Sequence, residues 1–251
     1  MTFGSGRGTC LLIGVLAVLA VVVGSSLAQE ATPTAHVPAL APDEPISGAS
    51  LAEWSARYWQ WTVSFPVSVN PGHDATGATC GYGQSGPVFF IPRNFPPCTV
   101  PAGVVLFVPI AGTVCSTAEP PPYAGRDEAE LRACAAAEVV RYTGIVVRVH
   151  GQQVPGIQAY RVSSPRFTLT LPEHNILGVA AGVAYAVADG YQVMLAPLSA
   201  GEHEIVAHVE LTDGTVLPDK MTRITVVGPV RIDLEATPDL GTPRATPVTQ
   251  G

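Results

Sequence analysis

Residues 204–227 read EIVAHVELTDGTVLPDKMTRITVV, and this stretch decides the fold class. Apolar residues recur at every second position from Ile205 to Leu211, which is the period of a strand with one buried face. Asp213-Gly214 is a typical two-residue hairpin turn that leads into Thr215 and onward to a second strand at 223–227. The stretch therefore predicts an antiparallel β-hairpin.

Similar signals lie upstream of this hairpin. Short apolar or alternating runs bounded by proline and glycine predict further strands, at 87–91, 104–110, 145–149, 167–171 and 191–196. His150-Gly151 predicts another tight turn. Many short strands at close spacing indicate a mainly β protein, a β-sandwich of Ig-like or jelly-roll-like type with two accessory α-helices.

The first helix is predicted to begin after Ser50 and to end before Pro66. Ser50 and Glu53 have the spacing of a capping box. One stripe of this helix is apolar and aromatic: Leu51, Trp54, Tyr58, Trp61 and Phe65. Trp59 lies off this stripe. The helix is therefore interpreted as an element held on the β-core by its aromatic side chains, or as an aromatic platform for a sugar or peptide with Trp59 as the binding residue.

Four cysteines remain when Cys10 is removed with the leader described below: Cys80, Cys98, Cys115 and Cys134. An even number in an exported chain predicts two disulfides, for which three pairings exist. We favour Cys80–Cys98 and Cys115–Cys134, because each closes a proline-rich loop of about 20 residues. A second helix, capped by Asp127, also turns Cys134 toward the strand that carries Cys115. A zinc site is the rival, but no C-x2-C pair is present, so we expect no metal.

The two ends of the chain differ in composition from its middle. Arg7, an apolar run and small residues before Gln29 predict a signal peptide over 1–28, cleaved after Ala28, with an uncleaved anchor as the alternative. Residues 29–46 and 236–251 are rich in proline and threonine and predict a disordered linker and a disordered tail. A single β-rich domain is expected over 47–235. The exported chain is expected to have no stable membrane insertion.

Charge excludes one class of partner. The chain has a net charge of −7, a pI near 5.3 and one lysine, Lys220, so it offers no cationic face to phosphates. Nucleic acid is therefore excluded as a main partner.

Two motifs suggest enzymes and fail on their context. Gly81 to Gly86 matches the dinucleotide pattern G-x-G-x-x-G, but no strand precedes it and no helix follows it. The segment from His203 to His208 resembles H-E-x-x-H, but its two histidines are five residues apart and would lie on opposite faces of a strand. We therefore expect no cofactor.

The remaining candidates are polar residues in predicted loops. A catalytic histidine–carboxylate or carboxylate pair would come from Glu173, His174, Asp189, Glu202 and His203. The carboxylate and carbonyl oxygens of this set, to which His73, Asp74 and Asn175 also belong, could instead bind calcium. Ordinary turn residues are the alternative interpretation, since Asp189-Gly190 and Gly201-Glu202 are common turn pairs.

Five blocks of the chain resemble, in the same order, a group of uncharacterised exported bacterial proteins: WSARYWQWTVSFP (54–66), CGYGQSGPVFF (80–90), CTVPAGVVLFVPI (98–110), CSTAEPPPYAGRDEAELRAC (115–134) and ADGYQVMLAPLSAGEHEI (188–205). The resemblance implies a bacterial exported protein whose pattern includes the four cysteines. It implies no activity, ligand or catalytic residue.

These observations predict a secreted protein, outside the cell or on the exterior of its envelope. Its expected function is that of a non-catalytic binding or structural module for an extracellular ligand, such as a glycan or a cell-surface component. A secreted hydrolase acting on polysaccharide or peptide is the alternative, and it requires two carboxylates, or a histidine and an acid, in one cleft.

Overall fold

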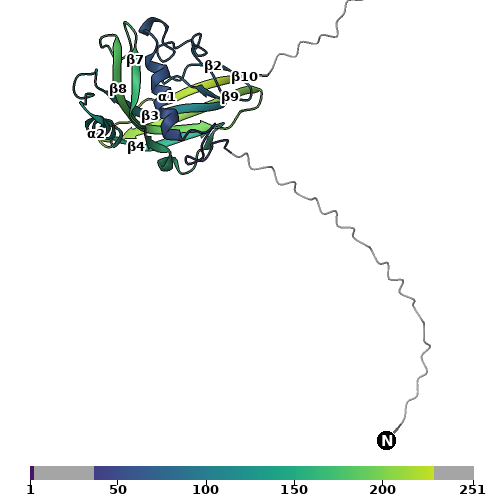
Figure 1. Cartoon of the computed structure of the whole chain (residues 1–251). Coiled ribbons are helices and arrows are strands. Elements are labelled where there is room, and N and C mark those ends of the chain that lie inside the picture. The colour runs from purple at the N-terminus through teal and green to yellow at the C-terminus, as the bar shows by residue number, and fades with distance from the viewer. Residues whose placement is uncertain (3–36, 229–251) are drawn as a thin grey trace, which may run out of the picture. The chain divides into compact units, whose positions relative to one another are not determined.

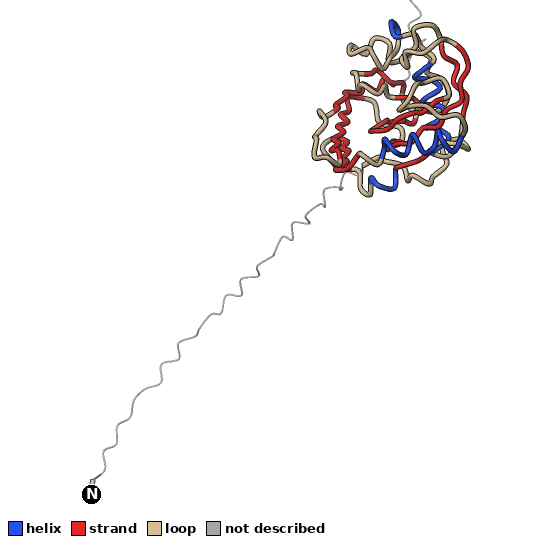
Figure 2. The backbone as a smooth tube through the Cα atoms, turned by 90° about the vertical axis from the view of Figure 1, so that its left-hand side faces the viewer, coloured by secondary structure: helices blue, strands red, loops and turns tan. Residues whose placement is uncertain are grey.

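The computed structural model describes residues 1–2 and 37–228. The predicted signal peptide, apart from Met1 and Thr2, and the predicted tail over 236–251 lie outside these residues. The described part from residue 37 onward forms one unit, and strands and loops make up most of it (Figure 2). Within the described ranges, no helix combines the length and apolar composition that a membrane span requires.

The helices are α1 (Leu51–Val63) and α2 (Glu128–Val139), with short 3₁₀ helices η1 (Val67–Val69) and η2 (Ile157–Tyr160). The strands are β1 (Val88–Phe90), β2 (Cys98–Pro101), β3 (Val105–Ser116), β4 (Tyr142–Val149), β5 (Gln152–Gln153), β6 (Arg161–Ser163), β7 (Phe167–Leu171), β8 (Gly182–Leu195), β9 (Gly201–Leu211) and β10 (Lys220–Val227).

The strands form two sheets, as the predicted β-sandwich requires (Figure 1). The first sheet has the order β1-β3-β8-β6, and β7 also pairs with β8; the second has the order β2-β10-β9-β4-β5. Both are mixed, because β1 runs parallel to β3 and β2 parallel to β10. Buried side chains from both sheets belong to the same hydrophobic core. The predicted sandwich with two accessory helices is therefore confirmed.

Helix α1 begins as the sequence predicts. The Ser50 hydroxyl accepts a hydrogen bond from the Glu53 amide, and the Glu53 carboxylate accepts one from the Ser50 amide. The predicted stripe is buried against the first sheet: Tyr58 stacks on Phe107 of β3 with ring centroids 5.0 Å apart. Trp59, although off this stripe, is also only 7% exposed. The aromatic residues thus fix α1 firmly on the sheet.

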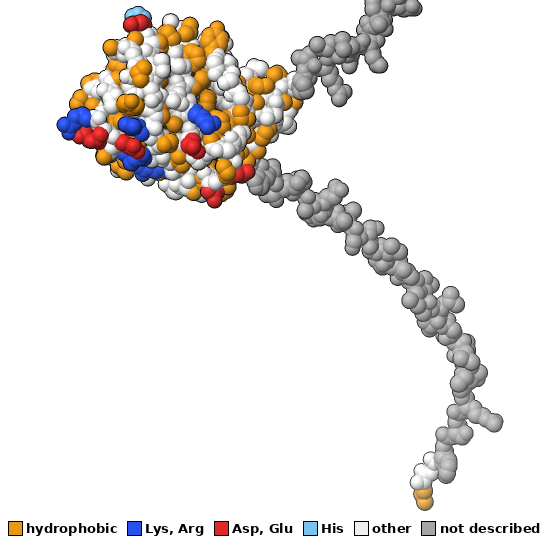
Figure 3. Space-filling model, in the orientation of Figure 1, with side chains coloured by type: hydrophobic (Ala, Val, Ile, Leu, Met, Phe, Trp, Pro, Cys, Tyr) orange, Lys and Arg blue, Asp and Glu red, His pale blue; other side chains and the backbone are white. Residues whose placement is uncertain are grey.

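The favoured disulfide pairing is confirmed. Cys80 is bonded to Cys98, which begins β2, and Cys115 of β3 is bonded to Cys134 of α2. The Asp127 side chain caps α2 by accepting from the Glu130 amide. The exposed ion pair Arg132–Glu128 lies on this helix, and a second, Arg126–Glu130, joins it to the residues before it; charged side chains gather over it in Figure 3. Helix α2 is thus anchored by its disulfide and apolar face, with its charges outward.

Three boundaries differ from the sequence prediction. Residues 37–46, predicted as linker, lie against the core: the Leu40 amide donates to Met194 O, and Ile46 is buried. Asp189 lies within β8 rather than in a turn, and Glu202 and His203 lie within β9 rather than in a loop. The turn at Asp213-Gly214 forms, but β10 begins only at Lys220, so the connection is longer than two residues.

Candidate functional site

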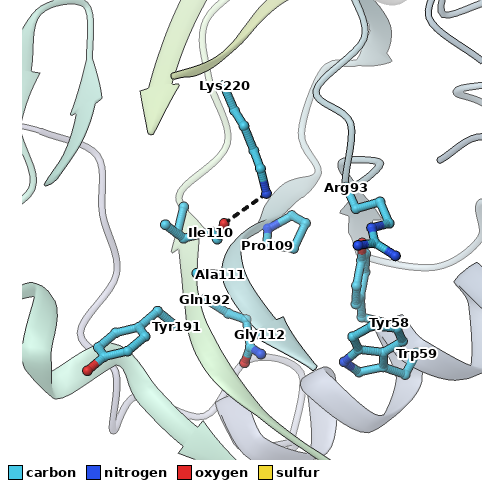
Figure 4. A pocket seen from close by; sticks show the side chains of 10 residues that line it. All are labelled: Tyr58, Trp59, Arg93, Pro109, Ile110, Ala111, Gly112, Tyr191, Gln192 and Lys220. Atoms are coloured by element: carbon cyan, nitrogen blue, oxygen red, sulfur yellow. Dashed lines mark hydrogen bonds between the residues drawn. The ribbon is translucent and has the colours of Figure 1, made fainter. Parts of the chain in front are cut away.

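A cleft is formed by α1, by the loop after β1 and by the facing strands β3, β8 and β10. Its inner chamber, about 40 Å³ in volume, is lined by Tyr58, Trp59, Arg93, Pro109, Ile110, Ala111, Gly112, Tyr191, Gln192 and Lys220 (Figure 4). An adjacent outer chamber of about 250 Å³ shares Trp59, Arg93 and Gly112 with it. The two chambers together are the candidate site.

An irregularity in β3 shapes the inner chamber. Pro109 cannot donate a ladder hydrogen bond, and the register with β8 shifts between Pro109 and Ala111, so Ile110 is the extra residue of a bulge. Beyond the bulge Gly112 faces Gly190 of β8, and a Cβ atom on Gly112 would lie 2.7 Å from Asp189 O. The bulge and the glycine pair thus let the two backbones approach closely at the wall of the cleft.

Lys220 enters the chamber from the start of β10. Its Nζ donates to the Ile110 carbonyl oxygen at 3.2 Å, which Figure 4 shows as a dashed line, and lies 5.8 Å from the centre of the Phe95 ring. Burial, and to a smaller extent the positive charge of Arg93, lowers the pKa of Lys220 to about 8. No carboxylate of residues 37–228 lies within ion-pair distance of this ammonium group.

Arg93 lies in the loop that follows β1, on the other side of the chamber. Its aliphatic stem passes close to Gly72, where an added Cβ atom would lie 3.1 Å from Arg93 Cγ. Figure 4 shows its guanidinium group above Tyr58 and Trp59. Among the described residues no side chain forms an ion pair or hydrogen bond with Arg93. Two cations therefore face one chamber without an anion.

Two buried polar groups of the chamber also lack partners in the described part of the chain. Tyr58 is 2% exposed and its hydroxyl has no hydrogen bond; Gln192 is 3% exposed and its amide oxygen has none. Burial raises the pKa of Tyr58 to about 12, although the charge of Arg93 and the neighbouring Thr62 hydroxyl oppose the shift, so the phenol stays neutral. Buried polar atoms without partners are rare, and here they face a chamber that a ligand can enter.

The outer chamber is acidic and aromatic. Glu119 accepts a hydrogen bond from the Ser116 hydroxyl at 2.8 Å, and burial nevertheless raises its pKa to about 7. Glu138 forms an ion pair with Arg141 at 3.1 Å. Tyr142 has its pKa raised by burial and then by the charge of Glu138. Near neutral pH, a large fraction of Glu119 is uncharged, so the cations of the cleft are only partly opposed.

The structure places the predicted site residues apart. Trp59 lines both chambers, where it is a buried part of the wall and not an exposed platform. Glu173 and His174 are exposed in the connection between β7 and β8, and Glu202 is exposed at the start of β9. Asp189 is paired with Arg161 at 2.9 Å. Among the described residues, none of the three predicted residues outside β9, Glu173, His174 and Asp189, forms a hydrogen bond or an ion pair with Glu202 or His203 within it.

His203 forms a separate pair. Its Nε2 donates to Ser199 O at 2.7 Å, so its Nδ1 accepts from His150 Nε2 at 2.8 Å. The other predicted polar residues, His73 and Asp74, lie in the loop after η1, where Asp74 accepts hydrogen bonds from Thr76 and Thr79. Within residues 37–228, no cluster of three or more histidine, cysteine, aspartate or glutamate side chains is placed to hold a metal ion.

Sequence reasoning missed Arg93, Lys220, Gln192 and Glu119. The one available signal was that Lys220 is the chain's sole lysine, placed at the edge of a predicted strand. No protein-family model matches the chain, and neither the curated proteins nor the solved structures contain a significant match to it.

Proposed function

We propose that the chain is an exported, non-catalytic binding protein whose cleft takes up a small ligand that carries a carboxylate. Export is supported by the predicted signal peptide together with the two disulfides, which persist in oxidising compartments. The observation that carries the proposed binding role is the pair of cations, Arg93 and Lys220, that face one chamber with no carboxylate at ion-pair distance in the described chain.

Carboxylate is the group that this chamber recognises best. A guanidinium presents parallel N–H donors that match the two oxygens of a carboxylate, and Lys220 adds a second charge. The Tyr58 hydroxyl can donate a neutral hydrogen bond to it, and the Gln192 amide oxygen can accept one from a hydroxyl elsewhere on the ligand. The rest of the ligand would lie in the outer chamber, against Trp59, Tyr123 and Tyr142. A uronic acid or another small ring-bearing acid has this combination of groups.

The test is a binding screen of the exported chain at pH 6. Acetate, glycolate, benzoate and glucuronate are each compared with a neutral counterpart, glucose in the last case, by thermal shift and calorimetry. We expect at least one acid to raise the unfolding midpoint while its neutral counterpart does not. Arg93→Gln should weaken that binding about tenfold or more, as the loss of a charge-assisted hydrogen bond predicts. Arg223→Gln, an exposed arginine on β10, should leave it unchanged.

Two results would contradict the proposal. One is the absence of any shift with all four acids. The other is equal binding by the wild type and by Arg93→Gln, which would place the ligand elsewhere.

A second candidate function rests on Glu119. Its half-buried carboxyl, with a pKa raised to about 7, shares a chamber with Glu138 and three aromatic side chains, as a general acid beside a second carboxylate would in a glycoside hydrolase. A screen of acidic and neutral polysaccharides for released reducing ends tests this role. Hydrolysis that is lost in Glu119→Gln and kept in Glu128→Gln, an exposed residue of α2, would favour the enzyme over the binding protein.

A further inference from the structure

The sole lysine of the chain is inside the cleft rather than on the surface. Lysine is a residue that proteins normally keep exposed or paired with an acid. Lys220 is half-buried and donates to a backbone carbonyl, with no carboxylate at ion-pair distance in the described residues. A desolvated amine beside another cation is an arrangement that activates lysine as a nucleophile.

The groups around Lys220 maintain this state. Arg93 faces it across the chamber, and Tyr58 is neutral. Asp219, the preceding residue, is bound to His208 at 2.7 Å, and Glu119 and Glu138 belong to the outer chamber. With a pKa of about 8, a fraction of the Lys220 amine is unprotonated near neutral pH, far more than for an exposed lysine.

We propose that Lys220 forms a reversible imine with the carbonyl group of a small oxo acid whose carboxylate is held by Arg93. The carboxylate part rests on the proposed function; the imine goes beyond it, because it makes the binding covalent. The inner chamber has room for about three water molecules and opens beside the outer one, which suits an acid of two or three carbon atoms at the reacting end.

The reaction needs no oxidant or reductant. The unprotonated Nζ attacks the carbonyl carbon, the C–N bond forms and the carbonyl π electrons move to oxygen. A proton passes from nitrogen to that oxygen and gives a carbinolamine. The C–O bond then breaks as the oxygen takes a second proton from solvent and leaves as water. The nitrogen lone pair forms the C=N bond of a protonated imine, which can return its remaining N–H proton to solvent. The Tyr58 hydroxyl and the Gln192 amide, which lack partners among the described residues, can hydrogen-bond the carbinolamine oxygen. Hydrolysis reverses each step.

The test is reductive trapping. The folded, exported chain is incubated with glyoxylate and sodium cyanoborohydride at pH 7, which converts an imine into a stable secondary amine that carries a carboxymethyl group. Peptide mapping then distinguishes Lys220 from the terminal amine. We expect Lys220 to be modified at least ten times faster than in the reduced, unfolded chain. Glycolate, which has a hydroxyl in place of the aldehyde, should slow the trapping by competition; this control requires no variant.

Arginine variants test the role of the carboxylate. Arg93→Gln should lower the ratio of glyoxylate to acetaldehyde trapping at least tenfold, because acetaldehyde has no carboxylate for Arg93 to hold. Arg223→Gln, on the same strand as Lys220, should leave that ratio unchanged.

The possible failures are distinguishable. If Lys220 is not trapped, or reacts no faster than in the unfolded chain, the imine is overturned. The proposed function still stands in that case if a carboxylate raises the unfolding midpoint through Arg93. Another outcome is a ratio of glyoxylate to acetaldehyde trapping that is the same in the wild type and in Arg93→Gln. In that case the oxo-acid proposal is overturned, and the proposed binding of carboxylates loses its support as well.

Discussion

Two places in the sandwich hold a cation below the surface, and only one of them supplies its counter-ion. Arg161 of β6 donates to Asp189 of β8 at 2.9 Å, and the Asp189 side chain is 6% exposed. Half-buried Lys220, with the exposed Arg93 on the other side of the chamber, faces the cleft with no such partner in the described chain. Unpaired charge below the surface lowers stability, so a fold gains nothing from it unless a ligand supplies the missing anion. The first pair is therefore structural, whereas the second is the pair that the proposed ligand would neutralise.

The largest effect is expected where the satisfied pair is broken. Asp189→Asn removes the anion and leaves Arg161 beside a neutral amide. Breaking a buried ion pair by removing one partner costs about 3–5 kcal/mol, and because Arg161 is 30% exposed we expect about 2–3 kcal/mol. Urea denaturation measures the loss. Asp43→Asn, at an exposed position outside the strands, should change stability by less than about 0.5 kcal/mol. A loss as small as that for Asp189→Asn would show that the pair is not structural.

The opposite sign is expected for Lys220→Met. Burial disfavours the ammonium group in the folded state, so the folded pKa of about 8 lies below the ordinary value of 10.5. The penalty is complete below pH 8 and disappears as the pH rises to 10.5, where the amine is neutral in both states. Methionine removes the penalty but also the hydrogen bond to Ile110 O.

We therefore expect Lys220→Met to be more stable than the wild type by about 1–2 kcal/mol at pH 7, with the difference closing by pH 10.5. Denaturation of both proteins at the two pH values measures it, since other groups titrate alike in both. A Lys220→Met variant that is less stable than the wild type at pH 7 would show that the hydrogen bond from Lys220 to Ile110 O stabilises the fold. Lys220 would then be structural, as Arg161 is.

The features that could be predicted from the sequence depend on neighbours in the chain. The caps of both helices involve residues three positions apart, and the hairpin at His150-Gly151 forms because both residues adopt positive φ. The disulfide pairing follows from short loops and from the face on which Cys134 lies. Each signal is local, so each could be recognised without knowledge of the fold.

Other features depend on residues that are far apart in the chain. The first half of β8 is rich in alanine, glycine and valine and is nearly continuously buried beyond Tyr185, so it lacks the alternation that identified β9. Asp189-Gly190 resembles a turn, but Gly190 faces Gly112 in the ladder and the strand continues. The cleft joins Tyr58, Arg93, Gln192 and Lys220 from four separate segments. The spacing of residues in the sequence does not indicate that these segments meet, and of the residues that line the inner chamber only Trp59 was expected to bind a ligand.

Glu119 is the group that could become a counter-ion in the cleft. Its pKa is raised from 4.5 to about 7, so the folded state binds its proton more tightly than the unfolded state does. The resulting stabilisation is complete below pH 4.5 and is lost as the pH rises through 7. Glu119→Gln should therefore match the wild type at pH 4 and exceed it by about 1 kcal/mol at pH 8. Denaturation at both pH values tests this; Glu128→Gln is the exposed control. Equal stability of the wild type and Glu119→Gln at pH 8 would mean that the ionised Glu119 carboxylate forms an ion pair with a cation.

The smallest effect on stability is expected for Arg93→Gln. A small loss is what we expect if Arg93 binds a ligand and does not stabilise the fold. Arg93 is exposed and has no ion pair or hydrogen bond with another described side chain, so the fold should lose less than about 0.5 kcal/mol when its charge is removed. Arg161→Gln removes the partner of the Asp189 carboxylate and should lower the free energy of unfolding by more than about 1 kcal/mol. Urea denaturation of the two variants without added ligand makes the comparison. If Arg93→Gln destabilises the chain as much as Arg161→Gln does, Arg93 is part of the scaffold, and its effect on binding no longer identifies a site.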